Sequence, residues 1–247
     1  MRIPAIVLTL ALVSCASNPA SPLREPAKNQ EVSPRLFIQP APVFDMECGQ
    51  RTGFKIDPQW YTELFKKTPL FQKHWNEQAE ALIAASEQAA GRKFSRSQYS
   101  VALTLCKWTP MGHPFIVSVR PYLDGPAKAD PSLGQPMSMN TFVSMTHHEL
   151  LHSLVDNLLS PDFDSPLLIK YKSEAPNVLV HLHLMAIQKA SYEKLNKRKM
   201  LEATNHLYAF IGGDYQRAWE IVAKEGTQPF LAELRAFNAK PATESHP

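Results

Sequence analysis

Residues 140–159 read NTFVSMTHHELLHSLVDNLL, and this stretch decides how the rest of the chain is interpreted. Either Ser138 or Asn140 can cap a helix here, and the helix is expected to run to about Leu159. The apolar residues recur at the spacing of one helical face, which predicts a helix packed on a core: Leu151, Leu154, Val155 and Leu158.

Two histidines and a glutamate on this helix form a pattern that suits a metal ion. His148 and His152 lie four residues apart, so both imidazoles can bind the same ion from one helical face. Glu149 follows the first histidine, where its carboxylate can act as general base toward a water that zinc activates. The alternative is a surface helix that carries two histidines by coincidence, and the apolar stripe argues against it. We therefore expect Zn²⁺ as the cofactor.

Helical periodicity continues on both sides of this stretch. Upstream, one long helix is expected to begin after Asp57 and to end near Gly91. Its apolar stripe weakens toward the end, where Ser86 falls on the same face. Downstream, Gly212-Gly213 marks a clear break among the further expected helices, which cover 174–196, 199–211, 214–224 and 229–238.

Two strands are predicted between the long helix and residues 140–159. Apolar residues alternate over 99–106 and again over 115–119, and Pro110-Met111-Gly112 can supply the turn between them. We expect an antiparallel hairpin, with the second strand at a sheet edge because Pro114 and Pro121 cannot donate to a ladder. The order of elements predicts an α+β fold that is mainly helical.

This arrangement resembles the core of a zincin metallopeptidase. Over residues 113–196 the chain shows an edge strand, a loop, an HExxH helix and a following helix that brings the last ligand. The resemblance implies that His148 and His152 bind zinc and that Glu149 is the catalytic base. It also implies that the edge strand around 115–119 pairs with an extended peptide substrate.

The resemblance is closer to one zincin subgroup than to another. The metzincin motif needs a glycine and a histidine where this chain has Val155 and Leu158, so that subgroup is excluded. The gluzincin subgroup takes its third ligand from a glutamate in the following helix, and this implies Glu174, twenty-two residues beyond the second histidine. Ser173 can cap that helix, and Pro176 fits its first turn.

His181 is the competitor of Glu174. It lies seven residues further on nearly the same helical face, so it is either a supporting partner of the ligands, a transition-state donor or itself the third ligand. His183 points to the opposite side, and His147 points about 100° away from its neighbour His148. Asp162 and Asp164 are lesser candidates. Four further residues are candidates for an oxyanion donor: Tyr171, His206, Tyr208 and Arg217.

The N-terminus predicts export. Residues 1–15 combine a short positive start, an apolar run too short to span a bilayer and the sequence LVSC, which resembles the lipobox of bacterial lipoproteins. The resemblance implies lipidation of Cys15 and a membrane anchor in the cell envelope, and the alternative is an ordinary signal sequence cleaved nearby. Residues 16–45 are rich in proline and predict an extended tether, which leaves 46–240 as the zincin-like domain.

Export changes how the two remaining cysteines are interpreted. Cys48 and Cys106 form an even pair in an oxidising compartment, so a disulfide is one hypothesis and two buried thiols are the other. A bridge would close a loop of nearly sixty residues, which stabilises a fold by about 4 kcal/mol.

Composition excludes some classes of function. The 247 residues carry a net charge of only +3, and apart from 194–199 the basic residues are scattered, so no nucleic-acid partner is expected. The resemblance implies an exported metallopeptidase that acts on a peptide or protein substrate. Two alternatives stay open: a zinc-binding but inactive envelope lipoprotein that serves as an assembly factor, and a zinc amidase that acts on cell-wall peptides. Glu149 argues against the inactive protein, because zinc binding alone needs only the ligands.

Overall fold

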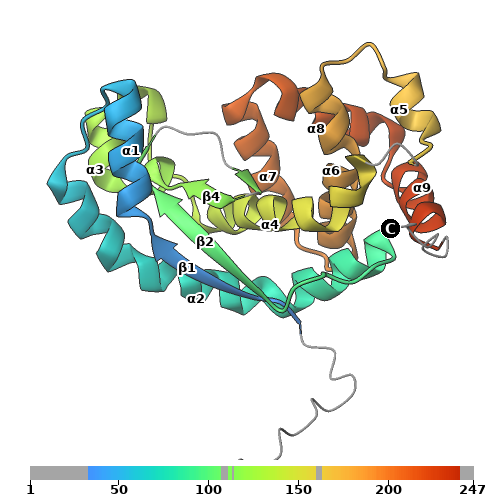
Figure 1. The fold of residues 1–247 in the computed structure, drawn as a ribbon, viewed down its shortest axis with the longest axis horizontal. Helices are drawn as coiled ribbons and strands as arrows, with labels where there is room; N and C mark the ends of the chain where they lie inside the picture. The colour runs from blue at the N-terminus through green and yellow to red at the C-terminus, as the bar shows by residue number, and fades with distance from the viewer. Residues whose placement is uncertain (1–32, 107–110, 113, 160–162, 240–247) are drawn as a thin grey trace, which may run out of the picture. The chain divides into compact units, whose positions relative to one another are not determined.

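The computed structural model describes residues 33–106, 111–112, 114–159 and 163–239. Within these residues the chain is mainly helical and carries one small sheet (Figure 1). The strands are β1 (Arg35–Pro40), β2 (Gln98–Thr104), β3 (Met111–Gly112) and β4 (Phe115–Ser118). The helices are α1 (Pro42–Thr52), α2 (Pro58–Ala90), α3 (Asp124–Ala129), α4 (Met139–Val155), α5 (Pro166–Lys170), α6 (Pro176–Lys194), α7 (Arg198–Ile211), α8 (Gly213–Glu225) and α9 (Gln228–Asn238).

The sheet differs from the predicted hairpin. Its strand order is β1-β2-β4-β3, with β1, β2 and β4 parallel and only β3 antiparallel to β4. The prediction that the strands at 99–106 and 115–119 form an antiparallel pair is therefore wrong. Side chains alternate identically in parallel and antiparallel strands, so the sequence pattern could not separate the two. The predicted edge position is also wrong, because β4 lies between β2 and β3.

Part of the predicted tether belongs to the fold. Residues 35–40 form β1 and pair in register with β2, and α1 follows at once, so the tether prediction is wrong for residues 35–45. Leu36 and Ile38 are buried beneath α2. The free edge of β1 is covered by Gln72 of α2, whose side chain accepts from the Ile38 amide (2.9 Å) and donates to the Leu36 carbonyl (3.0 Å).

The long predicted helix is confirmed as α2. The Asp57 side chain caps its start by accepting from the Gln59 amide, and Gly91 ends it with a left-handed φ of 70°. Ser86 is fully buried on its core face, where its hydroxyl donates to the Leu82 carbonyl and contacts His147 of α4. The polar residue in the stripe is thus explained by a polar partner across the interface.

Helix α4 lies at the centre of the packing. It contacts α2, α6 and α7 as well as strands β3 and β4, and α6 in turn contacts α8 and α9 (Figure 1). The predicted break is confirmed, since α7 ends at Ile211 and α8 begins at Gly213. No helix among the described residues is long and apolar enough to cross a membrane.

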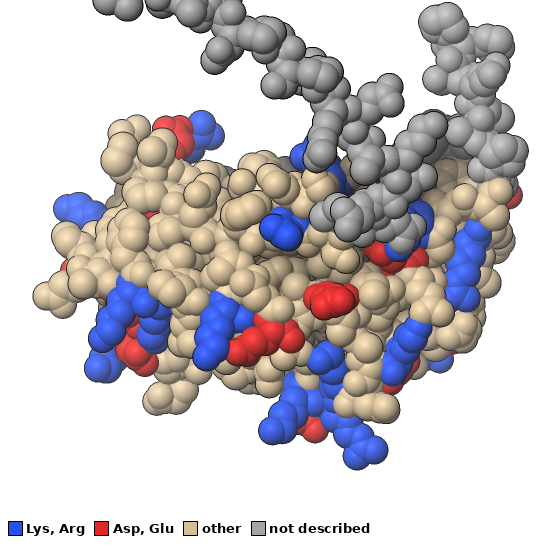
Figure 2. All heavy atoms as spheres, turned by 90° about the horizontal axis from the view of Figure 1, so that it is seen from below, with Lys and Arg blue, Asp and Glu red and all other residues tan. Residues whose placement is uncertain are grey.

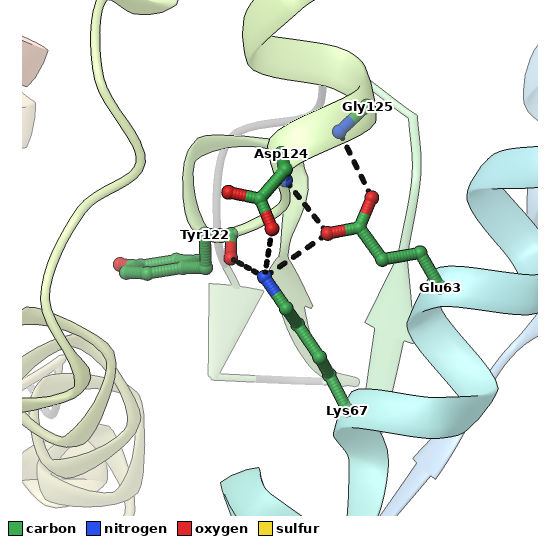
Figure 3. A network of polar contacts seen from close by, with 5 residues as sticks. All are labelled: Glu63, Lys67, Tyr122, Asp124 and Gly125. Carbon is green, nitrogen blue, oxygen red and sulfur yellow. Dashed lines mark hydrogen bonds and ion pairs between the residues drawn. The ribbon is translucent and has the colours of Figure 1, made fainter.

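The segment between β4 and α4 is more regular than its proline content predicts. It contains α3 and two short 3₁₀ turns, at Arg120–Tyr122 and Pro131–Leu133. The Glu63 carboxylate of α2 caps α3 from outside, accepting from the amides of Asp124 (2.7 Å) and Gly125 (2.9 Å), as Figure 3 shows. A Cβ on Gly125 would lie 2.8 Å from the Trp60 ring, so this close approach requires glycine.

Lys67 completes this network. Its ammonium group lies 3.0 Å from the Glu63 carboxylate and 2.9 Å from that of Asp124, and it donates to the Tyr122 carbonyl at 3.4 Å (Figure 3). The Tyr122 ring then packs edge-on against Phe142 of α4 (5.6 Å between centroids). The network therefore holds the segment that leads into α4 against α2.

We expect Glu63→Ala to lower the free energy of unfolding by about 1–2 kcal/mol, because it leaves two helix-terminal amides of α3 without their acceptor. Urea denaturation of the purified protein measures this. Glu47→Ala is the matched control, since Glu47 is a solvent-exposed partner of Arg51 and such pairs contribute well under 1 kcal/mol. Equal losses in the two variants would contradict the capping role of Glu63.

Candidate metal centre

Helix α4 carries the first two histidines of the candidate site and is enclosed on nearly all sides. Ser138 is its cap, with the hydroxyl accepting from the Thr141 amide (3.2 Å), so the first of the two predicted caps is confirmed. His148 and Glu149 are buried, with 0% and 1% of their surface exposed. The His152 side chain keeps 24% of its surface exposed. Solvent therefore reaches this face of α4 at His152.

A third histidine joins this pair from α6. One ring nitrogen from each of His148, His152 and His181 lies within 4.8 Å of the other two. The His148 and His181 rings stack at 5.1 Å between centroids, and the His152 ring meets both edge-on. Nitrogen ligands sit about 2 Å from zinc, so small side-chain adjustments are enough for all three to reach one ion. The cluster could hold a metal ion.

Glu174 is not part of this cluster. It lies before α6, which begins at Pro176 with Ala175 as its cap residue, so the prediction that Glu174 starts the helix with Ser173 as cap is wrong. The Glu174 carboxylate instead pairs with Arg217 of α8, with three contacts of 2.5, 3.1 and 3.2 Å. This pair lowers the pKa of Glu174 and keeps its carboxylate charged. The structure brings His181, and not Glu174, to the two histidines of α4.

The hydrogen bonds of the cluster leave the nitrogens that a metal needs free of protons. The Nδ1 of His181 lies 2.5 Å from the Asn177 carbonyl, which can only accept, so Nδ1 carries the proton and Nε2 has the lone pair. The Nδ1 of His148 lies 2.7 Å from the Tyr208 hydroxyl. In both histidines the opposite nitrogen, Nε2, is buried and has no hydrogen-bond partner among the described residues.

The two carboxylate oxygens of Glu149 are also buried without a hydrogen-bond partner within the described part of the chain. Four buried polar atoms on three residues thus converge without partners at one place, which is rare because an unsatisfied buried group costs about 1–3 kcal/mol. A divalent cation bound by the histidines would satisfy the two nitrogens and would lie close to the carboxylate. The donor set therefore fits a metal ion.

Burial also sets the protonation states at this site. It lowers the pKa of His148 and of His181, so both imidazoles are neutral at pH 7, as metal binding requires. It raises the pKa of Glu149 well above its ordinary value. A cation next to Glu149 would act in the opposite direction and favour its charged form.

Of the remaining predicted candidates, Tyr208 contacts the cluster and most of the others lie away from it. His147 is buried between Ser86 and Tyr192, and His183 pairs with Glu233 at 2.9 Å. Asp164 is exposed, and Asp162 lies outside the described residues. Of the four candidate oxyanion donors, Tyr171 and Arg217 bind acidic side chains away from the cluster, His206 is exposed, and the Tyr208 hydroxyl contacts His148.

Tyr215 of α8 lies beside the histidine cluster, and the sequence pattern did not identify it as a residue of the site. Its ring packs against those of His181 (4.6 Å) and His148 (5.3 Å), and burial, followed by the charge of Glu149, raises its pKa. In the sequence it belongs to an apolar stripe with Ala218, Trp219 and Val222, which is typical of core positions. Its spacing therefore gave no signal of proximity to the histidines.

The two cysteines form a disulfide. Cys48 of α1 is bonded to Cys106, two residues after the end of β2, with 6.3 Å between their Cα atoms. The bridge fastens α1 to the sheet, next to Asp45, whose carboxylate accepts from the Leu105 amide (2.9 Å). The predicted signal sequence and Cys15 lie outside the described residues.

Surface charge is mixed on the face drawn in Figure 2. Lys and Arg side chains there lie beside Asp and Glu side chains, with uncharged surface between them. Ion pairs among the described residues include Lys189 with Glu193 (2.7 Å) and Lys170 with Glu225 (2.7 Å). Positive potential is therefore offset locally in these places.

Comparison with models of protein families, with curated proteins and with solved structures finds no significant match for this chain.

We expect the purified protein to bind one zinc ion per chain. His181→Ala should weaken zinc binding by more than about a hundredfold, because removal of a ligand reduces metal affinity more than removal of a residue that only orients a ligand, which costs about 10–100-fold. Glu174→Ala is the matched control and should keep the affinity of the wild type. Elemental analysis and chelator competition measure both. The reverse result, with zinc lost in Glu174→Ala and kept in His181→Ala, would restore Glu174 as the third ligand.

Proposed function

We propose that this chain is a zinc-dependent, zincin-like metallopeptidase in which His148, His152 and His181 bind the metal and Glu149 is the general base. One observation carries the proposal: three histidines lie close enough to hold one ion, two of them have a buried nitrogen without a hydrogen-bond partner among the described residues, and the buried Glu149 carboxylate lies 3.7 Å from the third, His152. A structural zinc site would need only ligands, whereas this one adds a buried acid–base group beside them.

In the proposed reaction the metal ion and the side chains of the protein have different roles. Zinc, when bound, acts as a Lewis acid that polarises a carbonyl and makes water acidic enough to supply a nucleophile near neutral pH. The Glu149 carboxylate accepts the proton of the attacking water and then delivers it to the leaving nitrogen. Its Oε2 lies 3.7 Å from the His152 Nε2, so the proton is held next to the ligands.

Three histidines give the site a different charge from a set of two histidines and a glutamate. Neutral imidazoles leave the full double charge of the metal ion in place, as in other three-histidine zinc enzymes. That charge opposes the burial that raises the pKa of Glu149 and so favours the carboxylate form that a base needs. The replacement of Glu174 by His181 in the ligand set is therefore compatible with base catalysis.

A cavity beside His152 supports a preference for an apolar side chain in the substrate. It has a volume of about 300 Å³, near the lower end for ligand pockets, so it suits one side chain better than a large ligand. It adjoins the most exposed of the three ligands. Most of its lining is apolar: Val155, Leu158, Leu168, Leu179 and Val180, together with His152, Asp156 and His183.

The proposal includes export to the bacterial cell envelope, with Cys15 as a lipid anchor. The LVSC sequence at residues 12–15 is the basis for it. The Cys48–Cys106 disulfide supports the same location, because such bridges persist mainly in oxidising compartments. A membrane-anchored hydrolase of this kind would act on peptides or proteins within reach of its tether.

Glu149→Gln tests the proposed activity directly. We expect it to retain zinc but to hydrolyse an unfolded protein substrate at least about 10²-fold more slowly, because it lacks the general base. Wild type and Glu174→Gln serve as controls in the same peptide-release assay. Undiminished hydrolysis in Glu149→Gln would reject this residue as the base. Activity confined to cell-wall peptides would instead identify an amidase.

Leu168→Trp tests the cavity. We expect it to fill the space and to reduce kcat/KM for peptides with leucine beside the cleaved bond by about tenfold or more relative to alanine peptides. Ile169→Trp is the matched control, since Ile169 is 61% exposed and does not line the cavity. Competition between the two peptides in one reaction gives the ratio. An unchanged preference in Leu168→Trp would remove this cavity from substrate binding.

A further inference from the structure

Gln188 is a buried amide on α6, two helical turns after His181. Its Nε2 lies 2.9 Å from the Ser144 carbonyl of α4, with the hydroxyls of Tyr192 (3.1 Å) and Ser144 (3.3 Å) on the same side. A backbone carbonyl can only accept a hydrogen bond, so the amide nitrogen must face it. The oxygen of the amide, Oε1, then faces the opposite side.

Tyr208 of α7 occupies that opposite side. Its hydroxyl donates to the Gln188 Oε1, and it is also 2.7 Å from the Nδ1 of His148. A phenol carries a single proton, and Tyr208 uses it toward Gln188. The hydrogen bond with His148 therefore has only one direction: Nδ1–H donates and the Tyr208 oxygen accepts.

The consequence for His148 is a fixed tautomer. With the proton on Nδ1, Nε2 keeps its lone pair, and this is the nitrogen that is buried without a partner in the three-histidine cluster. The Ser144 carbonyl fixes the orientation of the Gln188 amide, and the amide oxygen fixes the direction of the Tyr208 hydroxyl. The hydroxyl oxygen in turn fixes the proton of His148 on Nδ1, which leaves Nε2 unprotonated. Ligand histidines in proteins commonly depend on such a partner for their tautomer and orientation.

His147, the residue before His148, is held in the opposite tautomer by its hydrogen bonds. Ser86 uses its proton toward the Leu82 carbonyl, so its oxygen accepts from the Nε2–H of His147 at 2.8 Å. The Nδ1 of His147 then receives the Tyr192 hydroxyl at 3.0 Å. His147 is therefore held in the other tautomer with both nitrogens occupied, whereas the chain through Tyr208 leaves one nitrogen of His148 available.

We infer that Gln188 and Tyr208 are positioning residues for the metal centre, which present His148 to the ion by fixing its proton on Nδ1. The inference rests on the proposed metal site but not on peptide hydrolysis. Helix α6 then has two roles: it supplies the ligand His181, and through Gln188 it orients a ligand on another helix.

The experiment combines two measurements on the full chain. Nitrogen-15 NMR of the metal-free wild type should show His148 protonated on Nδ1 and not on Nε2. Zinc affinity, from chelator competition, should fall about 10–100-fold in Tyr208→Phe and in Gln188→Met. Tyr192→Phe is the matched control, because Tyr192 contacts Gln188 and His147 but not His148, and it should bind zinc as the wild type does.

Three results would overturn the inference. A proton on the Nε2 of His148 in the wild type does so without any variant, even where a variant fails to fold. Equal zinc affinity in Tyr208→Phe and the wild type would also overturn the inference. The third result is an equal loss of zinc affinity in Tyr208→Phe and Tyr192→Phe, which would indicate general loosening of the core. Absence of zinc binding in the wild type would overturn the metal centre itself, and is distinguishable from these results.

Discussion

The burial of α4 is the constraint on which the rest of the structure depends. A helix enclosed by α2, α6, α7 and the sheet can hydrate few of its polar side chains, so most of its buried polar atoms need a partner within the protein. The hydroxyl of Ser86 contacts His147, and that of Tyr208, which donates to Gln188, contacts His148. Among the buried atoms of α4 left without a hydrogen-bond partner in the described part of the chain are the Nε2 of His148 and both carboxylate oxygens of Glu149.

The same packing explains which side chain of α6 joins the two histidines of α4. A helix presents residues seven apart on nearly one face, so once α6 packs on α4, His181 and Gln188 both reach it. Glu174 lies before the first turn of α6, where its carboxylate meets Arg217 of α8. Glu174 is thus held in an ion pair before α6 begins, and the side chain that joins the cluster, His181, comes from further along the helix.

The proposed hydrolysis depends on the protonation states, the solvent access and the cavity around the histidine cluster. Burial lowers the pKa of His148 and of His181 and raises the pKa of Glu149, and a bound cation would oppose the shift of Glu149. Solvent reaches the cluster at His152, where an apolar cavity also begins. The proposed hydrolysis therefore combines a water-accessible ligand, a sequestered base and a space for one apolar side chain.

The sequence by itself determined the HExxH helix, the long helix α2 and the helical C-terminal half, because these features depend on local periodicity and capping. Tertiary structure decided between Ser138 and Asn140 as the cap of α4, the parallel direction of β2 and β4, and the inclusion of β1 in the fold. It also decided that His181, and not Glu174, lies beside the two histidines of α4. Alternation is the same for parallel and antiparallel strands, and proline content hid a strand that a neighbouring strand stabilises. Whether a side chain reaches the site depends on where a helix begins and what packs on it, which spacing along the chain does not encode.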